Sequence, residues 1–109
     1  MDEFQITVEE VKNKLDARKI VLIDVREEWE NKLAKIDGSL LMPLRQLPSK
    51  INEIKKIAKG KEVVAYCHYG NRSSFAAELL RKNGIKNART MSGGIEGWSR
   101  KIDDKVARY

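Results

Sequence analysis

The sequence is poor in the residues that build disulfides and metal sites, because its 109 residues include one cysteine, Cys67, and one histidine, His68. A single cysteine excludes an intramolecular disulfide, and one cysteine with one histidine cannot supply a structural zinc site. We therefore expect no metal centre and no bound cofactor. A chain without disulfides suits a reducing compartment, so a cytoplasmic location is predicted.

Long apolar runs are also missing. No stretch approaches the roughly 20 apolar residues of a membrane-spanning helix, and residues 1–4 lack the basic region and apolar core of a secretory signal. No membrane association is therefore expected. A hydrophobic content of 41% beside 35% charged residues is typical of an ordinary soluble protein, and the length predicts one domain spanning residues 1–109.

The most informative stretch is 63–80, which contains the only cysteine. Its first four residues are mostly β-branched or aromatic and predict a buried strand. Apolar residues then recur at spacings of three and four, which predicts an amphipathic helix. The buried face of this helix is expected to hold Phe75, Ala76, Leu79 and Leu80. Gly84 is typical of the end of such a helix. Cys67 lies between the predicted strand and the predicted helix, where it opens a tight loop.

A thiol at such a junction lies at the positive end of the helix macrodipole, and the backbone amides of residues 68–72 can curl around it as donors. This environment favours the thiolate, so Cys67 is predicted to be a nucleophile near neutral pH. The alternative is an inert small residue at the end of a buried strand. Gly70, which permits a sharp turn, and Arg72, which offers a planar cationic fork to an anion, favour the reactive cysteine.

The N-terminal part of the sequence predicts a strand, a helix and a second strand. Residues 4–6 are a short strand candidate, and Thr7 with Glu10 three residues later has the spacing of a capping box at a helix start. The apolar run 20–23 is typical of a parallel strand covered on both faces. It ends in Asp24, at the edge where open α/β sheets place their sites.

Strand and helix patterns continue to alternate after this run. Strands are predicted at residues 39–42 and 88–91, and a helix with Pro48 in its first turn lies between them. Its apolar face is formed by Leu47, Ile51, Ile54 and Ala58. Gly93-Gly94 permits a close approach of backbone, and Trp98 is predicted to lie in the core. The alternation predicts an α/β fold with a parallel, doubly wound sheet.

Four segments together resemble the rhodanese-type sulfurtransferases, and the resemblance covers nearly the whole chain. They are Ile23–Glu27, Ile36–Pro43, Cys67–Ser73 and Gly93–Trp98. One departure is Lys35, where the family often has a histidine. The resemblance implies a single rhodanese-like domain with a central five-stranded parallel sheet, helices on both faces, and the cysteine after the central strand. It also implies a substrate-binding loop of His68, Tyr69, Gly70, Asn71 and Arg72.

The length of the cysteine loop separates two reactions. Four residues lie between Cys67 and Arg72, whereas tyrosine and dual-specificity phosphatases, which share the arrangement of cysteine, loop and helix, have five. The resemblance implies that a loop of the shorter length holds a persulfide sulfur. The longer loop of the phosphatases holds a tetrahedral phosphoryl group. A phosphatase also needs an acid for its leaving group, and neither Asp37 nor Glu96 has a distinguishing context.

The predicted function is therefore sulfur transfer. The Cys67 thiolate would attack the outer sulfur of thiosulfate or a related donor, sulfite would leave, and the Cys67 persulfide would pass its terminal sulfur to cyanide or a thiol acceptor. Amides 68–72 would stabilise the anionic persulfide. Two alternatives stay open: a small cysteine-dependent phosphatase or arsenate reductase of related fold, and a non-enzymatic module that carries sulfur or binds a partner through the same cleft.

Four residues are predicted to assist Cys67. Arg72 would bind the anionic end of the donor. His68 would either share that role or be a solvent-facing loop imidazole. Asp24 and Arg26 are predicted to support the site as a hydrogen-bonded ion pair near the active edge, because a cysteine already surrounded by amides needs no carboxylate base.

Positive charge is concentrated at the end of the sequence. Residues 81–109 hold eight Lys or Arg against three acidic residues, so nearly all of the net charge of +6 lies there. Nucleic-acid binding is not predicted, because no basic motif interleaved with aromatic residues accompanies this charge. The segment is either a solvated basic tail or, if it flanks the cleft, a source of field that steers small anionic donors or an acidic acceptor protein toward Cys67.

Overall fold

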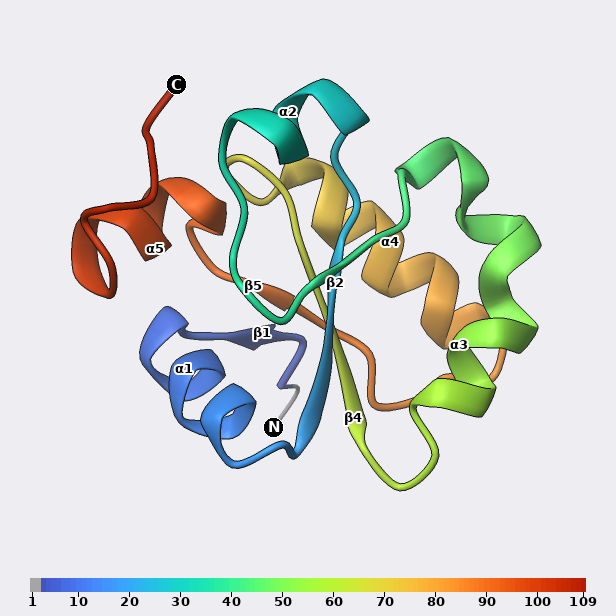
Figure 1. Ribbon diagram of the computed structural model, residues 1–109. Helices are drawn as coiled ribbons and strands as arrows, with labels where there is room; N and C mark the ends of the chain where they lie inside the picture. Colours follow the sequence, from blue (N-terminus) through green and yellow to red (C-terminus); the bar gives the residue numbers. More distant parts are fainter. Residues whose placement is uncertain (1–2) are drawn as a thin grey trace.

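A five-stranded parallel sheet runs through the centre of the molecule (Figure 1). The computed structural model describes residues 3–109. The strands are β1 (Gln5–Ile6), β2 (Ile20–Asp24), β3 (Leu40–Leu41), β4 (Glu62–Tyr66) and β5 (Arg89–Met91). Their order in the sheet is β1-β5-β4-β2-β3, and every neighbouring pair is parallel. The predicted fold class is confirmed, and β4, the strand that leads into Cys67, is the central strand.

Helices cover both faces of this sheet (Figure 1). They are α1 (Val8–Asp16), α2 (Glu28–Leu33), the 3₁₀ helix η1 (Leu44–Lys50), α3 (Ile51–Ile57), α4 (Asn71–Lys82) and α5 (Gly94–Lys101). Successive side chains of a strand point to opposite faces, so β4 contributes to two cores. Val63 and Ala65 pack in the core beneath α3 and α4, whereas Val64 and Tyr66 pack in the core beneath α1 and α5.

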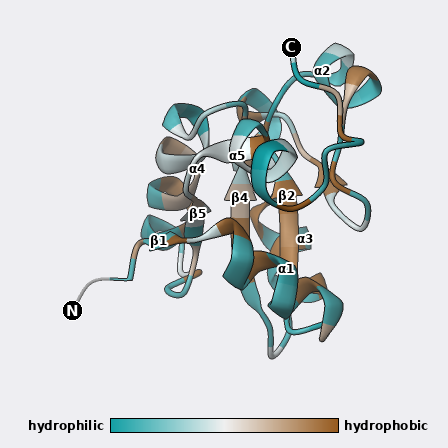
Figure 2. Ribbon diagram, turned by 90° about the vertical axis from the view of Figure 1, so that its left-hand side faces the viewer, coloured by the Kyte–Doolittle hydropathy of each residue, from teal (hydrophilic) through white to brown (hydrophobic). Residues whose placement is uncertain are grey.

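Burial on both faces explains the continuous apolar run of β2, which Figure 2 shows in brown between the helices. Ile20 and Leu22 belong to one core and Ile23 to the other. The predicted start of α1 is also confirmed, because the Thr7 hydroxyl accepts a hydrogen bond of 3.1 Å from the Glu10 amide.

Two helix details differ from the sequence prediction. Phe75 is 61% exposed, so its expected burial is wrong. The face of α4 on the sheet consists of small side chains and one leucine: Ser73, Ala76, Ala77 and Leu80. Small residues allow α4 to approach the strands closely, and the helical period then turns Phe75 outward. Pro48 lies inside η1, and the α-helix begins only at Ile51.

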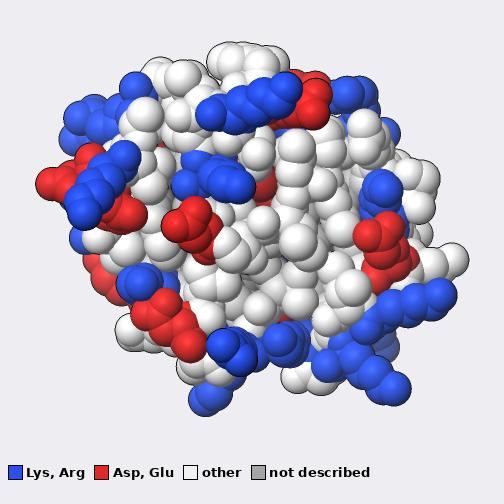
Figure 3. Space-filling model, viewed as in Figure 1, with Lys and Arg blue, Asp and Glu red and all other residues white. Residues whose placement is uncertain are grey.

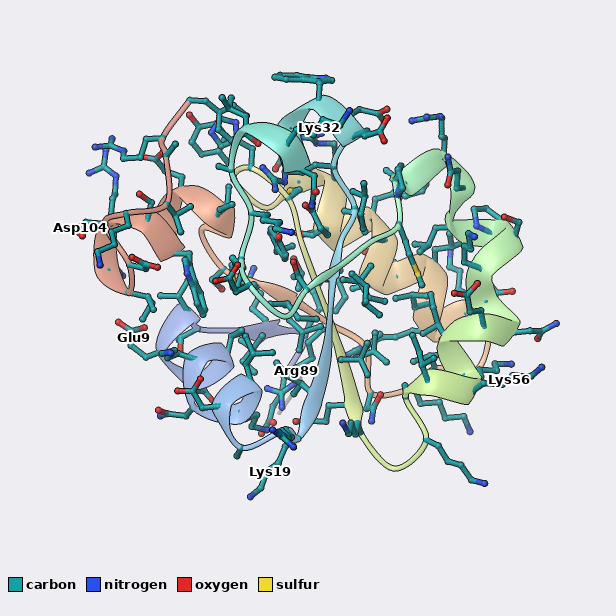
Figure 4. All side chains as sticks on the ribbon, in the orientation of Figure 1. Glu9, Lys19, Lys32, Lys56, Arg89 and Asp104 are labelled. Atoms are coloured by element: carbon teal, nitrogen blue, oxygen red, sulfur yellow. The ribbon has the colours of Figure 1, made fainter. Side chains whose placement is uncertain are left out.

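The two ends of the sheet carry different groups. Glu62, where β4 begins, accepts hydrogen bonds from Lys14 at 2.5 Å and from Arg89 at 2.7 Å. Figure 4 shows Arg89 at this lower end of the sheet, far from Lys32 on α2. The opposite end, where β2 and β4 finish, carries Asp24 and Cys67. None of the helices formed by residues 3–109 combines the length and apolarity needed to cross a membrane.

Candidate active site

Cys67 directly follows the central strand at the carboxyl edge of the sheet. It is 1% exposed and packs with the core beneath α3 and α4. Its neighbour across the sheet is the end of β2, where Asp24 pairs with Tyr66. The sequence therefore brings the thiol to the edge where parallel α/β sheets place their ligands, on a strand held from both sides.

Two backbone amides donate to the sulfur of Cys67. The Gly70 N lies 3.1 Å from Sγ and the Ser73 N lies 3.4 Å from it. Gly70 adopts φ +132°, a conformation that L side chains rarely take, and it directly precedes α4. The sulfur thus lies at the N-terminus of α4, as predicted, although its amide donors are residues 70 and 73 rather than a continuous run from 68 to 72.

Ser73 is a site residue to which the sequence prediction gave no role. Its Oγ lies 3.5 Å from Cys67 Sγ, 2.6 Å from Thr90 Oγ1 and 3.2 Å from the Gly70 carbonyl oxygen. Ser73 is fully buried. The third position of α4 points toward the sheet, so a polar residue there, amid alanines, was the available signal.

The N-terminus of α5 closes the loop from behind. Ile95 N donates to the Cys67 carbonyl oxygen at 2.9 Å, and Glu96 N donates to the His68 carbonyl oxygen at 3.2 Å. A Cβ on Gly94 would lie 2.2 Å from that His68 oxygen, so only glycine fits there. The predicted close approach of backbone at Gly93-Gly94 is confirmed. Amides of α5 therefore hydrogen bond to the carbonyl oxygens of the cysteine loop, while amides at the start of α4 face the sulfur.

Asp24 and Arg26 form the expected ion pair beside the site. Arg26 Nε and Nη2 lie 2.8 and 2.7 Å from the Asp24 carboxylate oxygens, and both side chains are fully buried. Arg26 also donates to the Ala34 carbonyl, the Glu30 carbonyl and the Tyr109 hydroxyl. Burial opposes the charge of Arg26, but these hydrogen bonds outweigh it and raise the pKa of the guanidinium.

Arg72 lies on Glu30 of α2. Its Nη1 and Nη2 are 2.7 and 2.9 Å from the two Glu30 oxygens. The Glu30 side chain is only 4% exposed, whereas that of Arg72 is 37% exposed. Burial alone would raise the pKa of Glu30, but the bonds from Arg72, the Glu27 amide and Tyr109 lower it to about 2. The hydrogen bond to Glu30 raises the pKa of Arg72, whose charge also interacts with Cys67.

His68 is sandwiched between two tyrosines. Its ring stacks on Tyr69, with centroids 4.0 Å apart and planes at 18°, and on Tyr109, with centroids 3.9 Å apart and planes at 14°. Its Nε2 is buried and has no hydrogen-bond partner among residues 3–109. The ring is therefore not the freely solvated imidazole that was one of the two alternatives. Neither Tyr109 nor Glu30 was assigned to the site from the sequence.

The remaining positions lie on the surface. Asn71 starts α4 and is exposed. Lys35, the departure from the family pattern, is also exposed and lines a separate cavity of about 660 Å³ beside α1 and the turn around Gly38. Within residues 3–109, no group of three or more His, Cys, Asp or Glu side chains is arranged to hold a metal ion.

Comparison with known proteins gives consistent matches. The model of the rhodanese-like domain matches residues 7–101. Uncharacterized protein YqhL of Bacillus subtilis is 39% identical over 99 residues, covering 91% of this chain and 76% of YqhL. The Zea mays adenylyltransferase and sulfurtransferase MOCS3-2 is 33% identical over 110 residues, covering 96% of this chain. The chain spans only about a quarter of the length of such larger relatives.

A solved structure has the same fold. The human single-domain sulfurtransferase TSTD1 superposes with a TM-score of 0.81 at 23% identity. The match covers 92% of this chain and 98% of the human protein. The arrangement of the sheet and the helices is therefore shared over nearly the full length of both chains.

Proposed function

The chain belongs to the rhodanese-like domain family, and from that premise we propose that it transfers a sulfane sulfur through a persulfide on Cys67. The observation that carries this proposal is the contact of Cys67 Sγ with the amides of Gly70 and Ser73 at the start of α4. Amide donors and a helix N-terminus stabilise a sulfur anion, both as the attacking thiolate and as the persulfide.

The first half of the reaction loads the cysteine. The Cys67 thiolate attacks the outer sulfur of thiosulfate, a Sγ–S bond forms, and the S–S bond of thiosulfate breaks. Sulfite leaves with the electron pair of that bond. In the second half, cyanide or an acceptor thiolate attacks the terminal sulfur, and the Cys67 thiolate departs. The products are thiocyanate or an acceptor persulfide.

Neighbouring residues have distinct roles in this proposal. The Ser73 hydroxyl, 3.5 Å from Sγ, is placed to donate to the sulfur when the thiol has lost its proton. The Arg72 side chain is partly exposed and has N–H groups beyond the two that contact Glu30, and these bind the anionic end of the donor. Asp24 and Arg26 hold the ends of β2 and α2 in place beside the loop. They exchange no proton with the substrate.

The acceptor is proposed from chemistry alone. The chain has no second cysteine to resolve a persulfide, so turnover requires an external nucleophile. Cyanide, a small thiol or the thiol of an acidic acceptor protein would serve. The name sulfurtransferase on MOCS3-2 supports the type of reaction proposed.

Intact mass spectrometry tests the proposal. After incubation with thiosulfate, the protein is expected to gain about 32 Da, the mass of one sulfur, on Cys67. Cys67→Ser is the matched control and should gain nothing. The loaded form should persist until cyanide is added and then release thiocyanate. Absence of the adduct on the wild-type chain, or hydrolysis of an aryl phosphate in its place, would contradict sulfur transfer from thiosulfate.

A further inference from the structure

Tyr109 lies across the space between the cysteine loop and α2. One face of its ring stacks on His68, which follows Cys67, and its ring is 6.1 Å from that of Trp29 on α2, in an edge-on contact at 78°. Figure 1 shows the C-terminal segment rising from α5 and ending beside α2. Figure 2 shows the same neighbourhood from the side. The tyrosine therefore bridges two walls of the site.

The hydroxyl of Tyr109 fixes the ring in this place. It accepts a hydrogen bond of 2.8 Å from Arg26 Nη1 and donates one of 2.7 Å to Glu30 Oε2. Both partners are buried charged residues, and hydrogen bonds to charged groups are the stronger kind. Burial raises the pKa of Tyr109 to about 12, so the hydroxyl keeps its proton and both bonds near neutral pH.

Contacts other than those of the Tyr109 hydroxyl also hold the C-terminal segment against α5. Ser99 Oγ donates to the Val106 carbonyl oxygen at 2.7 Å, and Arg108 binds Glu96 of α5 at 2.8 Å. Val106 and Tyr109 pack against the core beneath α1 and α5. The position of the tyrosine ring thus follows from contacts along the whole segment.

Cys67 itself has almost no surface open to solvent. The residue is 1% exposed, and the cavity of about 180 Å³ beside the loop is lined by Tyr69, Gly70 and Asn71 but not by Cys67. Gly94 and α5 block the rear of the loop. On the side of α2, Arg72 lies close enough to interact with both Cys67 and Tyr109, and Tyr109 stacks on His68. A donor that approaches the sulfur from this side meets the tyrosine ring.

We propose that Tyr109 is a specificity-determining residue that favours small reactants over bulky ones at Cys67. This inference rests on the proposed sulfur transfer for its biological meaning. A compact anion such as thiosulfate enters with a small displacement of the ring. A bulky reactant enters only after the stack on His68 and both hydroxyl hydrogen bonds have been broken.

Alkylation of Cys67 by reagents of two sizes tests the inference without any sulfur transfer. The probes are iodoacetamide and a fluorescein maleimide. In Tyr109→Ala, the rate with the maleimide should rise tenfold or more, because at least one strong hydrogen bond no longer has to break. The rate with iodoacetamide should rise less than threefold. Lys105→Ala, in the same segment, is the matched control and should behave as the wild type.

A second variant keeps the test decisive if Tyr109→Ala fails to fold, which a thermal melt would show. Tyr109→Phe retains the ring and removes the hydroxyl, so it should give an intermediate gain with the maleimide. An unchanged ratio of the two alkylation rates in every folded Tyr109 variant would overturn the role of Tyr109. Because alkylation needs no persulfide, that result would leave the sulfurtransferase proposal standing.

Discussion

Arg72 Nη1 and Nη2 donate to the two carboxylate oxygens of Glu30 at 2.7 and 2.9 Å. This pair of hydrogen bonds joins α2 to the first turn of α4. The arginine cannot be removed without leaving a buried carboxylate unpaired, which is costly. The role predicted from the sequence, binding of the anionic end of the donor, would by itself make Arg72→Ala impair thiosulfate use more than folding. The structure predicts that it lowers both.

Arg72→Ala is expected to lower kcat/KM for thiosulfate roughly tenfold to a hundredfold, because a hydrogen bond to a charged ligand is worth about 1.5–3 kcal/mol. Glu30→Gln is the control, since it removes the partner and keeps the cation. If Arg72 binds the donor, Glu30→Gln retains activity that Arg72→Ala loses. Equal losses in steady-state kinetics would make Arg72 only a structural partner of Glu30.

Glu30 also predicts a dependence of stability on pH. Its pKa in the folded protein is about 2, below the usual 4.5, because Arg72 and Tyr109 hydrogen bond to the carboxylate despite its burial. The stabilisation is therefore complete above pH 4.5 and is lost as the pH falls toward 2. We expect a loss on the order of 2–3 kcal/mol, after allowance for solvent around Arg72. Urea unfolding between pH 6 and 2 measures it, and Glu30→Gln should show a flatter profile.

Ser73→Ala is expected to slow alkylation of Cys67 by iodoacetamide near neutral pH about two- to tenfold, because the sulfur anion loses one donor worth about 0.5–1.5 kcal/mol. The matched control is Ser74→Ala. The Ser74 hydroxyl donates to the Gly70 carbonyl oxygen at 2.8 Å, and it is not among the groups within residues 3–109 that hydrogen bond to the sulfur. If the two variants react at the same rate, the Ser73 hydroxyl has no part in activating Cys67.

Gly94→Ala is expected to destabilise the protein by more than about 2 kcal/mol, since the new Cβ overlaps the His68 carbonyl and the residue has φ +60°. Gly97→Ala, in the same helix, meets its nearest atoms at 3.7 Å and should change stability little. Thermal unfolding of the pair measures the difference. A normal melting temperature for Gly94→Ala would show that α5 and the cysteine loop can separate without cost.

The charge of the C-terminal segment can be tested kinetically. Lys and Arg are interspersed with Asp and Glu on the face shown in Figure 3, and Arg100 pairs with Glu96 at 2.6 Å. We expect second-order rates with thiosulfate to fall as ionic strength rises, because steering is screened over about 8 Å at physiological salt. Reversal of Arg100 and Lys101 to Glu should lower them further. Lys56→Glu, on α3 (Figure 4), is the control. An equal fall in the rate with thiosulfate in this variant would show that the C-terminal segment has no local steering role.

The sequence predicted the elements whose positions depend on a local pattern of residues. The run 20–23 and the residues before Cys67 identified the two central strands, and Thr7 marked a helix start. The failure at Phe75 has a local cause, since spacing alone did not show that α4 needs small residues against the sheet. Glu30 and Tyr109 could not be found, because they meet across 79 residues and neither belongs to a recognisable motif.

The pairing of β1 with β5 has a consequence for synthesis on the ribosome. Gln5 has its sheet partner at Thr90, and Arg26 meets Tyr109 across 83 residues. The first strand therefore emerges long before its partner and waits unpaired at the edge of an incomplete sheet. Cys67 is made before α5 and Tyr109. We expect a nascent chain that stops short of α5 to carry an uncovered thiol, which reacts with bulky reagents until the last segment emerges and folds over it.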